Sequence, residues 1–211
     1  MSDGGERPRR DGPPATERGA SESSVTERDV SEPSAVAAGS RGRVIAVCGL
    51  PGTGKTTVAE RIADRLGGAV VRTDVIRKAL FDDPQYTDAE TAAVYDELLS
   101  RARDRAADGS SVVLDATFAD GRFREDAREA AAAVAAEFDL VEVTCDEAVV
   151  RRRIERRDGV SDADFDVYLQ FRRLFDPLTA DRVVVDNSGT QAETFAQVDA
   201  AFGASADADA E

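Results

Sequence analysis

The stretch RVIAVCGLPGTGKTTVA, residues 43–59, contains the pattern that decides the fold. Residues 44–48 form a short apolar, mostly β-branched run, which predicts a buried parallel strand. Residues 49–56, GLPGTGKT, match the phosphate-binding pattern G-x-x-x-x-G-K-[ST] without a mismatch, and apolar residues at helical spacing follow at once. Because this pattern works only between a strand and a helix, its context predicts a nucleoside triphosphate site here.

The residues of this loop have distinct predicted roles. Its glycines let successive backbone N–H groups converge on phosphate oxygens at the start of a helix. We expect Lys55 to reach the outer phosphates of ATP and the Thr56 hydroxyl to hold Mg²⁺. The predicted nucleotide-binding residues are Gly49, Pro51, Gly52, Thr53, Gly54, Lys55, Thr56 and Thr57.

The chain is strongly acidic: its 211 residues include 42 Asp and Glu against 27 Lys and Arg, with no His, for a net charge of −15. Lysine occurs only at positions 55 and 78, and most of the acidic excess falls within residues 43–203. Acidic surfaces keep proteins soluble at high salt, so the composition indicates a halophilic microbe. Cys48 and Cys145 are typical of small buried residues in a reducing cytosol. No apolar run resembles a membrane span or a signal peptide, so we expect a cytoplasmic protein.

Three segments are expected along the chain. Residues 1–42 hold too little apolar surface to offset the entropy of ordering, which predicts a disordered arm, and residues 204–211 predict a disordered acidic tail. Within residues 43–203, β-branched strands alternate with helices, which predicts an α/β fold: a three-layer P-loop NTPase with a five-stranded parallel sheet and an arginine-bearing lid. The expected strands are 44–48, 69–72, 111–115, 138–143 and 182–186, and the expected helices beyond the loop helix are 75–81, 87–108, 122–137, 147–157, 161–175 and 193–202.

Polar residues follow several of these strands. Ligands of such sheets lie at the carboxyl ends of the strands, so Asp74, Asp115 and Asn187 should share one rim with the loop. Asp115 ends an apolar run and is predicted to act on Mg²⁺ together with Thr56. At Asp74 and Arg77 the carboxylate can accept a proton from an acceptor hydroxyl, while the guanidinium can bind the substrate. Spacing alone supports equally well a helix N-cap at Asp74 that pairs with Arg77.

Arginines at positions 151, 152, 153, 156 and 157 crowd one predicted helix. Arg153 and Arg157 share a helix face, and charges this dense repel each other unless an anion lies against them. A triphosphate during transfer is such an anion, and the break at residues 158–160 favours a segment that closes as a lid. The alternative is a solvated basic face balanced by acidic neighbours.

Together these motifs resemble the small P-loop kinases, a group that includes polynucleotide kinase, gluconate kinase, shikimate kinase and zeta-toxin-like proteins, and ATP-binding proteins named AAA family ATPases. The resemblance implies that Asp74 is the acceptor-side base, that Arg77 and Arg122 bind the substrate, and that Arg153 and Arg157 are catalytic lid arginines beside Lys55. The sensor elements of hexameric AAA motors are not recognisable. The motifs that carry the resemblance are GLPGTGKTT (49–57), RTDVIRKAL (72–80), VVLDATF (112–118), RIERR (153–157) and SDAD (161–164), with DNSG (186–189) similar to an adenine-side segment.

Three functions remain open at this point. The first is a Mg²⁺- and ATP-dependent kinase that acts on a hydroxyl of a small molecule. The second is a regulatory ATPase without an acceptor; the guanine-specific N-K-x-D motif is absent, which argues against a GTPase. The third is a 5′-hydroxyl polynucleotide kinase, which the acidic composition disfavours because nucleic acid presents phosphates. The sequence leaves the acceptor and the oligomeric state open.

We expect residues 1–42 to be dispensable for folding and for ATP binding, because they hold too little apolar surface to join a core. A chain without them should melt at the temperature of the full chain, with and without Mg-ATP. Thermal unfolding followed by circular dichroism measures this. A large fall in the melting temperature would show that the arm packs on the domain.

Overall fold

The computed structural model describes residues 41–156 and 165–203. Its strands form one sheet in the order β2-β3-β1-β4-β5, in which every neighbouring pair is parallel. The predicted five-stranded parallel sheet is confirmed, and each predicted strand bound agrees with the structure to within about one residue. The strands are β1 (Arg43–Cys48), β2 (Ala69–Arg72), β3 (Ser111–Asp115), β4 (Glu137–Thr144) and β5 (Val183–Asp186).

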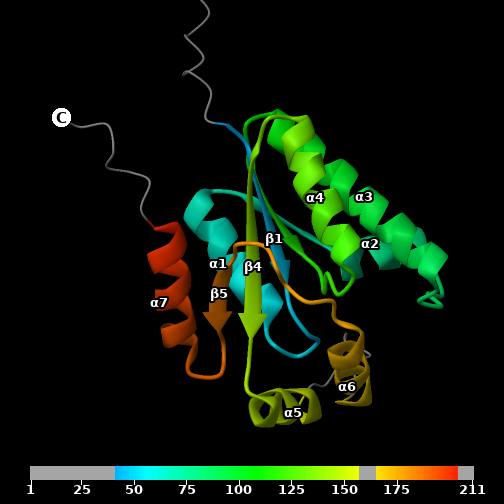
Figure 1. The fold of residues 1–211 in the computed structure, drawn as a ribbon, viewed down its shortest axis with the longest axis vertical. Coiled ribbons are helices and arrows are strands. Elements are labelled where there is room, and N and C mark those ends of the chain that lie inside the picture. Colours follow the sequence, from blue (N-terminus) through cyan, green and yellow to red (C-terminus); the bar gives the residue numbers. More distant parts are fainter. Residues whose placement is uncertain (1–40, 157–164, 204–211) are drawn as a thin grey trace, which may run out of the picture. The chain divides into compact units, whose positions relative to one another are not determined.

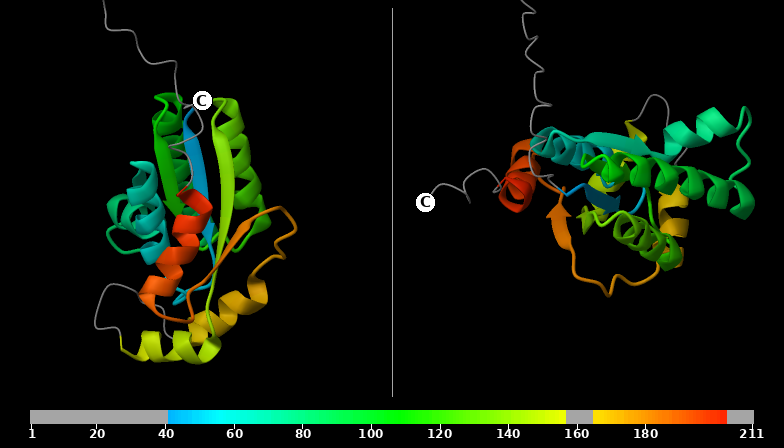
Figure 2. Two further views of the ribbon diagram at one scale, coloured as in Figure 1. Left: turned by 90° about the vertical axis from the view of Figure 1, so that its left-hand side faces the viewer. Right: turned by 90° about the horizontal axis from the view of Figure 1, so that it is seen from above.

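Helices cover both faces of this sheet (Figure 1). The helices α1 and α7 lie on one face and α3 and α4 on the other, which gives the three predicted layers; Figure 2 shows them from two further sides. The helices within the described ranges are α1 (Lys55–Leu66), α2 (Thr73–Leu80), α3 (Asp88–Ala107), α4 (Gly121–Ala133), α5 (Glu147–Glu155), α6 (Phe165–Leu174) and α7 (Gln191–Phe202).

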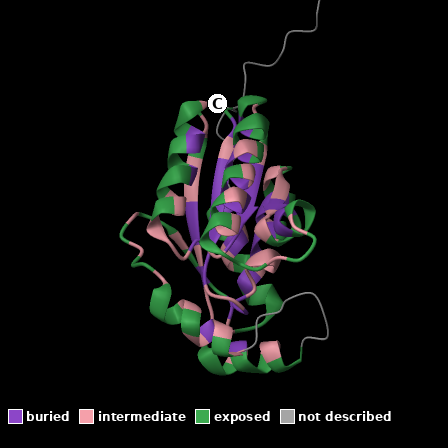
Figure 3. Cartoon of the chain, turned by 90° about the vertical axis from the view of Figure 1, so that its right-hand side faces the viewer, coloured by how far each residue is buried: buried purple, intermediate pink, exposed green. Residues whose placement is uncertain are grey.

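The sequence of the central strand β1 is continuously apolar because helices pack on both of its faces. Ile45 and Val47 pack with side chains of α1 and α7, whereas Val44, Ala46 and Cys48 pack with those of α3 and α4. All five side chains are fully buried, and Figure 3 shows the strands as the most buried part of the fold. A strand covered on both faces has no polar side to alternate with. Burial also raises the pKa of the Cys48 thiol to about 12.

The carboxyl ends of the strands meet at one edge of the sheet, because all neighbouring strands are parallel. In Figure 1 the arrowheads of β4 and β5 point to this edge, and α5 and α6 lie beyond it. These two helices contact each other: the Arg151 guanidinium lies 3.7 Å from the Phe165 ring centre, and Arg172 pairs with Glu147. We refer to α5 and α6 together as the lid.

Some helices differ from their predicted bounds. Helix α2 begins at Thr73, two residues before its predicted start, so the chain passes from β2 into the helix without a loop. Helix α4 ends at Ala133 rather than at residue 137. Its alanine-rich sequence favours helix, but Ala135 takes a left-handed φ of 54° and the Ala136 N–H bonds back to the Ala131 carbonyl. The chain then enters β4, whose pairing with β1 outweighs the helix propensity of alanine.

The ladder between β1 and β4 extends to Gly42, whose carbonyl oxygen accepts a hydrogen bond from the Glu137 N–H at 2.8 Å. A Cβ at position 42 would lie 2.1 Å from the Ala106 carbonyl oxygen. A truncation that tests the N-terminal arm should therefore keep Gly42. Residues 1–40 of the predicted arm, the acidic tail and the predicted SDAD cap at 161–164 lie outside the described residues. None of the described helices is both long and apolar enough to cross a membrane.

Candidate nucleotide-binding and active site

The loop between β1 and α1 has glycine at the positions where residues of other elements pack closely against it. Gly49, Gly52 and Gly54 all have positive φ, which costs glycine little. A Cβ at Gly52 would lie 2.8 Å from Cγ1 of Val150 in α5, and a Cβ at Gly54 would lie 2.1 Å from Nδ2 of Asn187. The loop is therefore bordered by α5 and by the turn after β5, and glycine is required for space as well as for conformation.

Two side chains of the loop motif fold back on it. The Thr53 hydroxyl and the Lys55 ammonium both donate hydrogen bonds to the Leu50 carbonyl oxygen, at 2.9 and 3.0 Å. Lys55 is the first residue of α1, so its long side chain must turn back over the loop to make this contact. The positive charge of Lys55 thus lies at the loop, where the motif predicts the outer phosphates.

The two predicted metal ligands lie together. Thr56 Oγ1 donates a hydrogen bond to Asp115 Oδ2 at 2.6 Å, and Asp115 is only 6% exposed. Mg²⁺ at nucleotide sites usually takes one or two protein oxygens and fills its other positions with phosphate oxygens and water. Among the described residues no cluster of three or more His, Cys, Asp and Glu side chains could hold a metal. Thr56 and Asp115 thus place two oxygens side by side, as the predicted Mg²⁺ site requires, and their role as metal ligands stays a prediction.

Arg72, at the end of β2, is a site residue that the sequence reasoning missed. It pairs with Asp115 in the parallel register, and its Nε lies 3.3 Å from Asp115 Oδ2. Its Nη2 also donates to Thr56 Oγ1 at 3.4 Å. A signal existed in the sequence, because two predicted strands end in residues of opposite charge at the same rim. The strand order that makes them neighbours was not part of the prediction.

Asn187 fastens the loop to the last strand. Its side chain is buried, Nδ2 donates to the Thr53 carbonyl oxygen at 2.7 Å, and Oδ1 accepts from the Thr194 hydroxyl of α7 at 2.8 Å. The sequence placed Asn187 on the rim, but it gave no indication of this contact. The predicted similarity of residues 186–189 to an adenine-side segment stays a prediction.

Among the lid arginines within the described residues, Arg153 contacts the phosphate loop. Its Nη1 lies 3.5 Å from the Thr53 carbonyl oxygen. Arg151 stacks on a ring of α6, and Arg152 donates to a carbonyl within α5, so both have structural contacts inside the lid. Arg157 lies outside the described residues. The arginine cluster is thus divided between holding the lid together and contacting the loop.

Asp74 and Arg77 have different surroundings. Asp74 is exposed in the first turn of α2, whose N-cap is Arg72. Arg77 is buried against α3, with Nη1 3.8 Å from Glu90 Oε2 and its guanidinium 4.7 Å from the Tyr86 ring centre. The N-cap alternative is therefore corrected: the earlier start of α2 moves Asp74 inside the helix, and Arg77 pairs with Glu90.

Arg122, predicted to bind the substrate, lies in the first turn of α4 with its side chain 80% exposed. Its Nη2 lies 2.6 Å from Asp120 Oδ2, and hydrogen bonding to Arg122 lowers the pKa of the Asp120 carboxyl. A substrate anion at Arg122 would have to compete with this carboxylate or share the guanidinium with it.

The segment that follows Asp115 is held by buried contacts. The Phe118 N–H donates to the Tyr95 hydroxyl of α3 at 2.9 Å, and burial raises the pKa of Tyr95, so the hydroxyl stays neutral. The Tyr95 ring stacks on Phe123 with centroids 3.8 Å apart. From α4, Arg124 donates to the Phe118 carbonyl at 2.6 Å. These contacts fix the rim on the side of β3.

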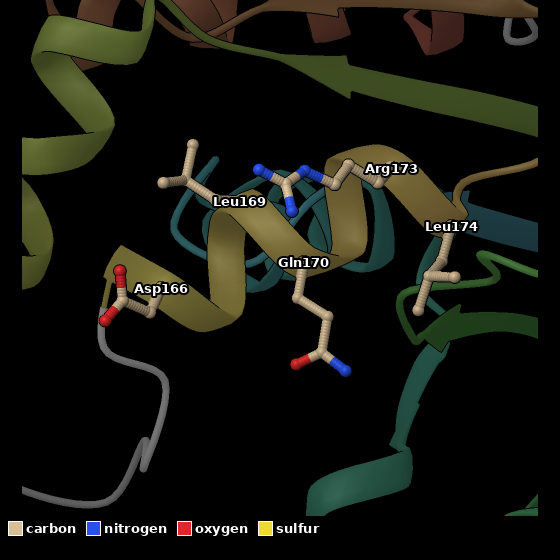
Figure 4. Close-up of a pocket in the computed structure, with 5 residues that line it drawn as sticks. All are labelled: Asp166, Leu169, Gln170, Arg173 and Leu174. Atoms are coloured by element: carbon tan, nitrogen blue, oxygen red, sulfur yellow. The ribbon is translucent and has the colours of Figure 1, made fainter.

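A hollow of about 350 Å³ lies against α6, but all of its lining residues belong to that helix (Figure 4). In Figure 4, Leu169 and Arg173 extend to one side of α6, and Gln170 and Leu174 to the other. A binding site needs polar groups that converge from several elements. The rim at the phosphate loop meets that condition, whereas the hollow does not.

A model of the AAA domain family matches residues 44–178, which include the phosphate loop, Asp74, Asp115 and the lid. The chain belongs to the AAA domain family. Among curated relatives of this AAA domain chain is "Uncharacterized protein Rv2004c" of Mycobacterium tuberculosis, which is 35% identical over 140 residues. That alignment covers 59% of the chain and 28% of the relative, so the AAA domain chain spans little more than a quarter of that protein.

Solved structures similar to this fold include kinases. A sugar kinase from Janibacter sp. HTCC2649 has a TM-score of 0.61 at 19% identity, over 75% of the chain and 93% of that kinase. A gluconokinase from Sinorhizobium meliloti 1021 has a TM-score of 0.57 at 22% identity, over 78% and 95%. The Mycobacterium tuberculosis APS kinase CysC, in complex with AMPPNP and APS, has a TM-score of 0.59 at 20% identity, over 75% and 95%. The AAA domain chain therefore has a P-loop kinase-like fold, as the resemblance predicted.

Asn187→Asp should weaken the attachment of the phosphate loop. The variant keeps the shape of the side chain but places a carboxylate oxygen against the Thr53 carbonyl in a buried position. We expect the free energy of unfolding to fall by about 2 kcal/mol, because a buried acceptor loses its donor. Urea unfolding measures this, with Gln191→Glu as the control, since it makes the same amide-to-carboxylate change at an exposed residue. Equal stability of the two variants would contradict the role of Asn187.

Proposed function

We propose that this chain is a Mg²⁺-dependent phosphotransferase that moves the γ-phosphoryl group of ATP to a hydroxyl of a small molecule. The observation that carries the proposal is the 2.6 Å hydrogen bond between Thr56 and Asp115 at the start of α1. It joins the last residue of the phosphate-binding motif to the acidic residue of a neighbouring strand. Two oxygens in that position fit a cation that bridges ATP phosphates.

Charges converge on the loop in a way that suits phosphoryl transfer. Lys55 and Arg153 each donate to a carbonyl of the loop, at 3.0 and 3.5 Å. Phosphate oxygens can replace these carbonyls as stronger, charged acceptors, because hydrogen bonds between ions are about twice as strong as neutral ones. In this position the two cations would stabilise the charge that spreads over the phosphoryl oxygens during transfer, and Mg²⁺ would neutralise further charge when bound.

Asp74 is the proposed acceptor-side base. It lies in the first turn of α2, which starts where β2 ends at the same rim as Asp115, and its side chain is exposed to an incoming substrate. In the proposed step the acceptor oxygen bonds to the γ-phosphorus, the bond from that phosphorus to the bridging oxygen of ADP breaks, and the hydroxyl proton passes to Asp74. Arg77 in α2 and Arg122 in α4 are the proposed substrate-binding residues.

Small molecules are the proposed acceptor class. Three of the structural neighbours are named as a sugar kinase, a gluconokinase and an APS kinase, and the last was determined with AMPPNP and APS. A polynucleotide acceptor is disfavoured, since a chain with a net charge of −15 offers few basic groups for broad phosphate contacts, and molar salt would screen both repulsion and attraction. The remaining alternative is a regulatory ATPase without an acceptor, in which Asp74 would have no chemical role.

The acceptor screen separates the kinase from the regulatory ATPase, and Asp74→Asn tests whether Asp74 is the acceptor-side base. The variant removes the charge but keeps the size of the side chain, so ATP binding should survive while transfer to the acceptor falls by roughly 10²–10⁴-fold. An acceptor is first found by screening ATP consumption at high salt against sugars, nucleosides, antibiotics and 5′-hydroxyl oligonucleotides. Asp82→Asn, which removes an exposed charge just after α2, is the matched control and should retain activity.

Lys55→Ala in the same assays should lose ATP binding as well as transfer, because the outer phosphates lose the lysine of the loop. Unimpaired transfer by Asp74→Asn would remove Asp74 as the acceptor-side base, whereas a screen in which no acceptor raises ATP consumption would favour the regulatory ATPase. Unimpaired ATP binding by Lys55→Ala would remove the phosphate-loop assignment itself.

A further inference from the structure

Arg72 occupies the immediate surroundings of the proposed metal pair. Its Nε lies 3.3 Å from Asp115 Oδ2, and its Nη2 lies 3.4 Å from Thr56 Oγ1. Thus one guanidinium contacts both of the oxygens that fit Mg²⁺. The register of β2 on β3 dictates this position, because Arg72 and Asp115 are paired residues at the ends of neighbouring parallel strands.

The ion pair between Arg72 and Asp115 neutralises the carboxylate but leaves part of the hydrogen-bonding capacity of Arg72 unused. The Asp115 side chain is 7% exposed, so its carboxylate would be costly without a positive partner. The Nε of Arg72, however, is buried and makes no hydrogen bond to any described residue, despite its short distance to Asp115. The Thr56 hydroxyl already donates to the same carboxylate oxygen. An arrangement that leaves a buried N–H unpaired is weaker than a bidentate pair, and an ion of higher charge can replace it.

We propose that Arg72 competes with the divalent cation for Asp115, and so sets how much Mg²⁺ the nucleotide site requires. The inference rests on the proposed function, since it concerns the metal of that site. The guanidinium neutralises Asp115 when no metal is bound, and it must leave the carboxylate when a metal binds there. Its side chain is 37% exposed, which leaves room for the charged end to move into solvent at the rim.

The alternative role for Arg72 is that of a phosphate ligand only. This alternative predicts a different metal affinity for the nucleotide-free chain. A phosphate ligand has no influence on metal binding until phosphate is present. A competitor for Asp115 weakens metal binding even in the absence of nucleotide, because like charges about 4 Å apart repel and because the metal must break the ion pair. Metal binding to the nucleotide-free chain therefore distinguishes the two.

The test is Mn²⁺ binding to the full chain without nucleotide, measured in molar KCl from the electron paramagnetic resonance signal of free Mn²⁺. Arg72→Gln should bind Mn²⁺ about tenfold more tightly than the natural chain at one site, whereas Arg72→Lys, which keeps the charge, should stay close to the natural chain. Adding Asp115→Asn to Arg72→Gln should abolish the gain. The matched control is Arg182→Gln, which uncovers the partly buried carboxylate of Glu142 away from the metal pair and should gain no such site.

Equal Mn²⁺ affinity of Arg72→Gln and the natural chain would overturn the inference, as would an equal gain in Arg72→Lys. The proposed function is tested separately by binding of a fluorescent ATP analogue to the natural chain with Mn²⁺ present. Failure of that binding would remove the nucleotide site but would not alter the comparison of metal affinities.

Discussion

The carbonyl oxygens of the phosphate loop need hydrogen-bond donors from other parts of the chain, because a loop that turns its N–H groups inward turns its carbonyls outward. The Leu50 carbonyl is satisfied within the motif, by Thr53 and Lys55. The Thr53 carbonyl receives Asn187 from the turn after β5 and Arg153 from the lid. One backbone oxygen thus fixes both the last strand and the arginine-bearing helix around the nucleotide site.

The parts of this arrangement that sequence could predict are those that depend on local patterns. Five β-branched runs marked the strands, and the motif marked the loop. The contact of Thr56 with Asp115 was predictable once Asp115 was placed at the end of its strand and the motif at the same rim of the sheet. The contact of Arg72 with Asp115 depends on β2 lying beside β3, which no local pattern reports. The end of α4 could not be predicted from the sequence either, because the alanines around residue 133 favour a helix and the pairing of β4 with β1 is not visible in a local pattern. The metal, substrate and lid roles stay predictions.

The use of arginine in place of lysine has structural consequences. A planar guanidinium can stack on an aromatic ring while its edge stays hydrated, which a lysine ammonium cannot do in the same way. Arg151 joins the lid helices by lying 3.7 Å from the Phe165 ring centre, and Arg43 lies 5.2 Å from that of Phe202 in α7. Contacts of this kind depend less on bare charge attraction than surface ion pairs do, and so they suit the high-salt origin that the composition predicts.

The hydrogen bond from Asn187 to the Thr53 carbonyl spans 134 positions of the chain. During synthesis, a ribosome makes the whole phosphate-binding motif long before it makes the residue that fastens it. A nascent chain that ends before β5 therefore contains the complete phosphate-binding motif but lacks Asn187, whose amide donates to the Thr53 carbonyl. Contacts between residues so far apart in the sequence form late in folding. The phosphate loop should therefore become able to bind a nucleotide near the end of folding, after the central strands have assembled.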